Sequence, residues 1–69
     1  MPSSVIRRLD YDAPARRLTI AFTSGDIYAY LDVPPIEAEG LAAAASKGRF
    51  FADRIRERFA FERVKIAAP

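Results

Sequence analysis

The sequence predicts an α+β domain: a three-stranded antiparallel β-meander followed by two short α-helices, with a short C-terminal strand as an option after them. Three observations carry this prediction. Apolar and polar residues alternate over residues 17–22 and 27–31, as they do in half-buried strands. A glycine turn separates these two runs, and after the prolines at 34 and 35 apolar residues recur at helical spacing. The 69 residues are enough for a single domain, expected to span 1–69 with its core at about 4–64.

The first two strands are expected at residues 4–10 and 17–22. In the first, Val5 and Leu9 share a side with Tyr11, and Arg7 interrupts the alternation. Residues 11–15 form a turn, because its aspartate can bond the local backbone and its proline fixes φ. The second strand is more regular, since its apolar residues at 18, 20 and 22 all point to one face.

The third strand is expected at residues 27–31, after a hairpin in which Gly25 takes a positive φ. One row of this strand contains Ile27, Ala29 and Leu31, and the other contains Tyr28 and Tyr30. The first row is the natural extension of the apolar face of residues 17–22. This pairing places the two tyrosines on the opposite face of the sheet, although a slip of one residue would exchange the faces.

Two helices are expected in the second half of the chain. The first runs from Pro35 to about residue 45, with Ile36 and Leu41 in its buried stripe, and Gly40 inside it costs about 1 kcal/mol relative to alanine. The second runs from about residue 49 to 59. Its expected core face consists of Phe51, Ala52, Ile55 and Phe59. Phe61, Val64 and Ile66 suit either a short last strand or a packed tail, and residues 67–69 are expected to fray.

Composition excludes several classes of function. The chain has no cysteine and no histidine, so we expect no disulfide, no metal site, no cofactor and no catalytic residues, and we predict that it is not an enzyme. No charge-free apolar run approaches the roughly 18 residues of a membrane span, and the N-terminus lacks an apolar leader segment. We therefore expect a cytoplasmic protein without a membrane partner.

The tyrosine pair is the first candidate binding site. Tyr28 and Tyr30 lie two residues apart, so on a strand they share a face. An exposed pair of this kind can stack unpaired bases of RNA. Under the alternative interpretation a helix covers this face, and the two rings belong to the core with their hydroxyls at its rim.

Basic residues supply the other candidates, because residues 47–69 carry seven basic and three acidic side chains. Ser46, Lys47 and Gly48 precede a helix start and suit an anion, or they form a plain capping turn. The basic residues expected to contact the phosphate backbone of a nucleic acid are Lys47, Arg49, Arg54, Arg56, Arg58 and Arg63. Alternatively, Asp53 and Glu57 neutralise these arginines at helical spacing. For Asp10 and Asp12 we expect a role in the turn rather than as metal ligands.

Six short motifs follow one another along the chain. They are Asp10-Tyr11-Asp12, Leu18-x-Ile20-x-Phe22, Ser24-Gly25-x-x-Tyr28-x-Tyr30, Val33-Pro34, Ser46-Lys47-Gly48-x-Phe50-Phe51 and Ile55-Arg56. Together they resemble the KTSC domain, a family named after the C-terminal extension of some lysyl-tRNA synthetases and also found as small free-standing bacterial proteins. The resemblance covers about Ser4 to Val64, with Phe50 where a tyrosine is often found.

The resemblance implies an RNA-binding role, suggested by the association with a synthetase. The predicted function is therefore an RNA-binding module for tRNA-like or single-stranded RNA, which combines aromatic stacking with a basic helix. The alternative is a protein-interaction or adaptor domain without a nucleic-acid role. It would use Phe50 and an exposed sheet surface to bind another protein or a second copy of itself.

Overall fold

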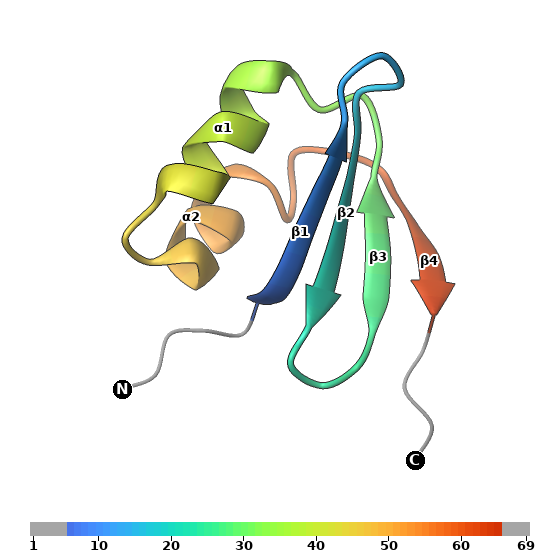
Figure 1. The fold of residues 1–69 in the computed structure, drawn as a ribbon, viewed down its shortest axis with the longest axis vertical. Coiled ribbons are helices and arrows are strands. Elements are labelled where there is room, and N and C mark those ends of the chain that lie inside the picture. Colours follow the sequence, from blue (N-terminus) through green and yellow to red (C-terminus); the bar gives the residue numbers. More distant parts are fainter. Residues whose placement is uncertain (1–5, 66–69) are drawn as a thin grey trace.

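The computed structural model describes residues 6–65, and the expectations for residues 4, 5 and 66–69 lie outside this range. Four strands and two helices make up the fold (Figure 1). In chain order they are β1 (Ile6–Asp12), β2 (Arg17–Phe22), β3 (Ile27–Tyr30), α1 (Pro35–Ala43), α2 (Lys47–Arg54) and β4 (Phe61–Lys65). The strands form one antiparallel sheet in the order β1-β2-β3-β4. The predicted α+β class is thus confirmed, and the optional last strand exists.

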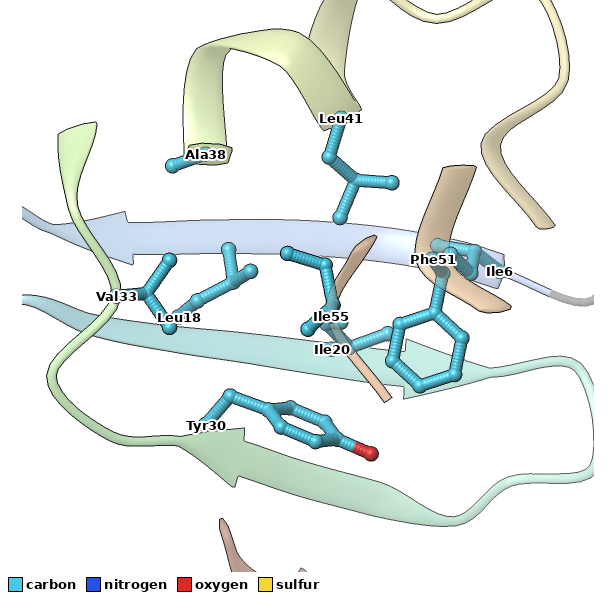
Figure 2. Close-up of a cluster of buried hydrophobic side chains, with 9 residues drawn as sticks. All are labelled: Ile6, Leu18, Ile20, Tyr30, Val33, Ala38, Leu41, Phe51 and Ile55. Carbon is cyan, nitrogen blue, oxygen red and sulfur yellow. The ribbon is translucent and has the colours of Figure 1, made fainter. Parts of the chain in front are cut away.

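The helices lie on one side of the sheet, and the chain after α2 crosses to the far edge, where β4 pairs with β3 (Figure 1). The core lies between this side of the sheet, here called the helix face, and the helices. Figure 2 shows Ala38 and Leu41 of α1 above the strands, with Phe51 and Ile55 over the ring of Tyr30. The opposite side of the sheet, called the open face, has no helix over it among the described residues. No helix within residues 6–65 is long and apolar enough to cross a membrane.

The predicted faces of β3 are wrong. Leu18 pairs with Tyr30 and Ile20 pairs with Tyr28, so both tyrosines share the helix face with the apolar row of β2. The reason is the length of the hairpin: the Phe22 N–H donates to the Asp26 carbonyl at 2.9 Å, which leaves a three-residue loop. A loop of two or four residues would have produced the predicted pairing. Ala29 faces the open side, where its neighbours on β2 and β4 bury it completely.

The first strand also differs from its predicted alternation. A β-bulge lies between Ile6 and Arg8, where Arg7 is the extra residue. The bulge returns Ile6 to the same face as Leu9 and Tyr11, and Ile6 is only 5% exposed. Arg7 interrupts the alternation of the sequence because it is the extra residue of this β-bulge.

Both helices are shorter than predicted, and some of their buried positions differ. Ile36 is 74% exposed, because Ala38 and Leu41, three residues apart, face the sheet instead. Helix α2 ends at Arg54 rather than residue 59, since two successive backbone N–H groups, of Ile55 and Arg56, both donate to the Phe51 carbonyl.

The early end of α2 changes which of its residues reach the core. The chain turns toward the sheet after Arg54, and this turn brings Ile55 into the core and packs Phe59 against it. Phe51 is buried as predicted, whereas Ala52 is exposed.

The end of the sheet opposite the β2–β3 hairpin is closed by polar contacts. The Tyr11 hydroxyl donates to the Val33 carbonyl at 2.6 Å, and the Val33 N–H donates to the Arg16 carbonyl at 2.8 Å. Arg16 and Asp32 both adopt positive φ, at 55° and 57°, and their side chains form an ion pair at 3.3 Å. These contacts tie the β1–β2 turn to the segment that leads into α1.

Candidate nucleic-acid interface

Three aromatic rings form a row at the β3–β4 edge on the helix face. Phe61 pairs with Tyr30 across the two strands, and its ring centroid lies 5.5 Å from that of Tyr30 and 5.3 Å from that of Tyr28. Tyr28 also meets Phe22 edge to face at 5.7 Å. The three rings differ in burial: Tyr30 is 3% exposed, Tyr28 is half-buried, and Phe61, which contacts both, is 45% exposed. The group therefore joins the core to the surface.

Tyr30 has the packing of a core residue. Its ring meets Phe51 of α2 edge to face at 5.4 Å, and Figure 2 shows it beneath Phe51 and Ile55. Burial raises the pKa of its hydroxyl above the ordinary value of 10.0; the nearby Tyr28 raises this pKa further, and Arg56 lowers it in part. Of the two interpretations, the packed one describes Tyr30, and Tyr28 lies between core and solvent.

Two arginines border the aromatic row. Arg56 acts on the Tyr30 hydroxyl through its charge, and Arg63 lies directly opposite Tyr28 on β4, hence on the same face. Both are exposed, and within residues 6–65 neither has a carboxylate oxygen within 4.0 Å. We call the surface formed by Tyr28, Arg56, Phe61 and Arg63 the aromatic–arginine edge. It combines accessible ring area with two cations that lack an acidic partner in the described chain.

The other predicted basic residues lie elsewhere. Arg54 pairs with Glu37 of α1 at 3.6 Å and lies over the ring of Phe50 at 5.4 Å, which ties the two helices together. Arg49 lines a hollow of about 310 Å3 next to Phe50, on the α1–α2 side of the molecule. Arg58 lies exposed in the turn after α2. Of the predicted basic residues, the structure therefore brings Arg56 and Arg63 to the tyrosines, and the others do not form one surface with them.

The Ser46-Lys47-Gly48 turn makes the contacts of a helix junction. The Ser46 hydroxyl accepts a hydrogen bond from the Arg49 N–H at 3.4 Å and so caps α2. The Lys47 ammonium donates to the Ala44 carbonyl at 3.3 Å, at the C-terminal end of α1. These groups satisfy helix ends that would otherwise lack partners. Anion binding at this turn stays a prediction, and none of the contacts described here supports it.

The acidic pair near the first turn has the expected local role at one of its two positions. The Asp12 carboxylate accepts a hydrogen bond from the Ala15 N–H at 3.4 Å inside the turn. Asp10 lies on β1, paired with Thr19. Within residues 6–65, no group of three acidic, histidine or cysteine side chains is arranged to hold a metal ion.

The sequence predicted Arg63 as a phosphate contact but placed neither Phe61 nor Arg63 beside the tyrosines. Their alternation, Phe61-x-Arg63, was the available signal, because on a strand these two residues share a face. Without the pairing of β4 with β3, nothing in the sequence placed that face beside Tyr28. Phe50, proposed as an exposed contact residue, is half-buried against Gly40 instead.

Comparison with known proteins gives a consistent result. The family model of the KTSC domain matches residues 2–59. A lysine–tRNA ligase of Nostoc punctiforme is 43% identical over 61 residues, which are 88% of this chain and 11% of the ligase. A protein of Tsukamurella paurometabola is 40% identical over 57 residues, which are 83% of this chain and 85% of that protein. The chain thus spans about a ninth of the ligase and most of the small protein.

A solved structure shares the fold. The crystal structure of a KTSC domain protein from Yersinia pestis matches with a TM-score of 0.87 at 35% identity, over 94% of this chain and 92% of that one. The match extends over nearly the whole length of both chains.

Proposed function

This chain belongs to the KTSC domain family, and from this premise we propose that it is an RNA-binding module, without catalytic activity, whose contact surface is the aromatic–arginine edge. The observation that carries the proposal is the exposed ring of Phe61 beside Tyr28, with Arg56 and Arg63 bordering them. The composition supports a module that binds rather than catalyses, since the chain has neither histidine nor cysteine.

The chemistry of this edge suits single-stranded RNA. A base can stack on the exposed ring of Phe61 without regard to sequence, because every base has a π-face. Arg56 and Arg63 can then contact phosphates near that base, since neither forms an ion pair with a carboxylate within residues 6–65. The buried Tyr30 does not contact RNA in this arrangement and supports the ring row from below.

The relatives support RNA as the ligand class. The matched ligases carry tRNA in their names, and the matched region is only 11% of their length, so it accompanies a much larger enzyme. A small domain of this kind is suited to add affinity for the nucleic acid on which a host protein acts. The ligase activity itself belongs to the rest of those proteins and is not proposed for this chain.

The test is a fluorescence anisotropy titration with a labelled oligouridylate and with tRNA, repeated over a series of salt concentrations. We expect Phe61→Ala to weaken binding by roughly 5- to 150-fold, the equivalent of about 1–3 kcal/mol for one stacked base. Arg56→Gln and Arg63→Gln should each lower the slope of log affinity against log salt by about 0.7. All three residues are exposed, so these variants should fold normally.

Two control variants match these changes. Arg16→Gln removes one positive charge from the β1–β2 turn, where Arg16 is paired with Asp32. Ile36→Ala removes an exposed apolar side chain from α1. Neither should change the affinity by more than about twofold. The absence of RNA binding at low salt, or equal losses in the control and edge variants, would rule out the proposal.

The edge strand β4 favours a second candidate, a protein-interaction domain. All five residues of β4 are exposed, its outer backbone edge has no paired strand in the described chain, and Val64 is 52% exposed. Such an edge can accept a strand from another chain. Light scattering over a range of protein concentrations distinguishes the candidates, because pairing of two copies through β4 would double the mass at high concentration and protect the β4 amides from exchange.

A further inference from the structure

We propose that the open face of the sheet carries a separate binding site for a phosphate group, formed by Arg7, Arg8 and Lys65. These residues line a hollow of about 240 Å3 at the β2–β3 hairpin end of the sheet, the lower end in Figure 1. Its floor includes Ala21 and Ile27, which are paired on the open face. The aromatic–arginine edge lies on the helix face, so the two sites are distinct.

The β-bulge in β1 creates the arginine pair. Consecutive residues of a regular strand point to opposite faces, but a bulge places two residues opposite one residue of the partner strand. Here Arg7 is the extra residue and Arg8 pairs with Ala21, and both arginines line the same hollow. Two arginines thus line one hollow, although strict alternation would place them on opposite faces.

Lys65 reaches the hollow from the other edge of the sheet. It pairs with Ile27, and the pairing of β3 with β4 has its own irregularity between Ile27 and Tyr28, at the same end of the sheet. Both edge strands are therefore irregular where the cations meet. The small residues Ala21 and Gly25 line the hollow between the cations and leave it open.

The lining of this hollow is positively charged, and the carboxylate of Asp10 lies in the adjoining hollow that shares Arg8, Ala21 and Ile27. The lining of the hollow at Lys65 contains three cations and no carboxylate, and none of the ion pairs within residues 6–65 involves Arg7, Arg8 or Lys65. Another hollow, of about 290 Å3, shares Arg7 and Arg8 but has Lys47 as its third cation. The Lys47 ammonium already donates to the Ala44 carbonyl, so the hollow at Lys65 is the better anion site.

Size and geometry select a phosphate group over a larger ligand. A volume of 240 Å3 is below the roughly 300–1,000 Å3 of sites that enclose a whole small molecule. It corresponds to about eight water molecules, enough for one tetrahedral anion and part of its hydration shell. The planar guanidinium groups can each donate two parallel hydrogen bonds to phosphate oxygens, and the lysine adds a third positive charge.

The test is an NMR titration of the uniformly labelled chain with inorganic phosphate, at an ionic strength held constant with chloride. We expect saturable shifts of the backbone amides of residues 7, 8, 25 and 65 and of the arginine side-chain N–H groups. Arg8→Gln and Lys65→Gln should each weaken phosphate binding by about tenfold, as expected for loss of one charge-assisted contact. Both side chains are exposed, so the spectra of the variants should otherwise be unchanged.

Arg17→Gln is the matched control. It removes one positive charge from the same face of the sheet at its other end, where Arg17 pairs with Glu62 at 3.2 Å. This variant should bind phosphate as the natural sequence does. Shifts that do not saturate, or that persist undiminished in Arg8→Gln and Lys65→Gln, would overturn the proposal.

A second arm with dimethyl phosphate identifies the source of the group. If this diester moves the same amides, the phosphodiester backbone of a nucleic acid fits the site. If only inorganic phosphate does so, the site takes free phosphate or a terminal phosphate. Failure of both ions overturns the site and leaves the RNA proposal untouched, since Phe61→Ala and Arg56→Gln test that proposal on the other face.

Discussion

The hydroxyl of Tyr11 joins β1 to the segment between β3 and α1, which has no strand pairing with β1. Its ring packs against the core, and its hydroxyl donates to the carbonyl of Val33, a fully buried residue 22 positions later. The segment around Val33 has to leave β3 and start α1, and the Val33 N–H donates to the Arg16 carbonyl. A side-chain donor from β1 therefore satisfies a backbone acceptor that the sheet leaves unpaired.

For Tyr11→Phe we expect a loss of about 1–2 kcal/mol in the free energy of unfolding, because the Val33 carbonyl loses its donor in a partly buried position. Urea denaturation followed by circular dichroism measures this loss. Tyr28→Phe is the control, since it makes the same chemical change on the same face of the sheet. Equal unfolding midpoints for the two variants would show that the Tyr11 hydrogen bond contributes nothing.

At the scale of elements, the junction of α1 and α2 depends on one close approach. Gly40 lies in the middle of α1, and a Cβ atom built there would lie 2.6 Å from Cζ of Phe50. The glycine thus gives the ring of Phe50 its place on α1, and Arg54 covers that ring from α2. In the sequence, Gly40 is only a residue of low helix propensity. In the structure, the absence of a side chain at this position makes room for the ring of Phe50.

For Gly40→Ala we expect a net loss of about 1 kcal/mol, because overpacking against Phe50 outweighs the gain of about 1 kcal/mol in helix propensity. The same substitution in a Phe50→Leu background should become neutral or stabilising. A double-mutant cycle measured by thermal or urea unfolding tests this coupling. An identical effect of Gly40→Ala in both backgrounds would contradict the role assigned to the Phe50 ring.

How far the sequence predicts this fold can be read from its elements. Strand positions and helix starts follow from local chemistry, namely alternation, Gly25, Pro35 and the capping Ser46, and each element begins within two residues of its predicted start. The first strand continues through residues 11 and 12, which were predicted to belong to the turn. The face of the sheet on which the β3 tyrosines lie was predicted wrongly, because it depends on whether the hairpin loop has two, three or four residues. The sequence around Gly25 permits each of these lengths, and only the packing of Tyr30 against Phe51 selects one.

The candidate site was harder to predict for a related reason. Phe61 and Arg63 join Tyr28 only through the pairing of β4 with β3, a contact between residues more than 30 positions apart. The bulge that brings Arg7 and Arg8 to one hollow also could not be predicted from the alternation of apolar and polar residues, because the bulge interrupts that alternation. The residue pattern within one strand or helix is enough to predict that element. A site formed by two strands can be predicted only when the register between the strands is known.

At the scale of the whole molecule, one small core supports both faces of the sheet. Tyr30 is part of that core, so its ionisation is linked to folding. Because the pKa of Tyr30 is raised in the folded state, the folded chain holds this proton more tightly than the unfolded chain does. The stability that depends on the neutral hydroxyl is complete below pH 10.0, the ordinary value, and is lost as the pH rises above it.

We therefore expect the free energy of unfolding to fall as the pH is raised above 10.0, and we expect this fall to be smaller in Tyr30→Phe, which has no hydroxyl to ionise. Urea unfolding at a series of pH values, with tyrosinate absorbance as a second observable, measures both. A pH dependence that is identical in Tyr30→Phe would show that Tyr30 is not the group responsible.

The even number of strands affects how such a domain can be combined with other proteins. The pairings of Ile6 with Phe22 and of Ile27 with Lys65 put the first and last described residues at the same end of the sheet. They lie three interstrand spacings apart, roughly 14 Å. A gene segment encoding this unit can therefore be spliced into a surface loop of a host protein, or added at either end of it, without forcing the flanking chain apart. Modular transfer of this kind requires nothing from the fold beyond its existing topology.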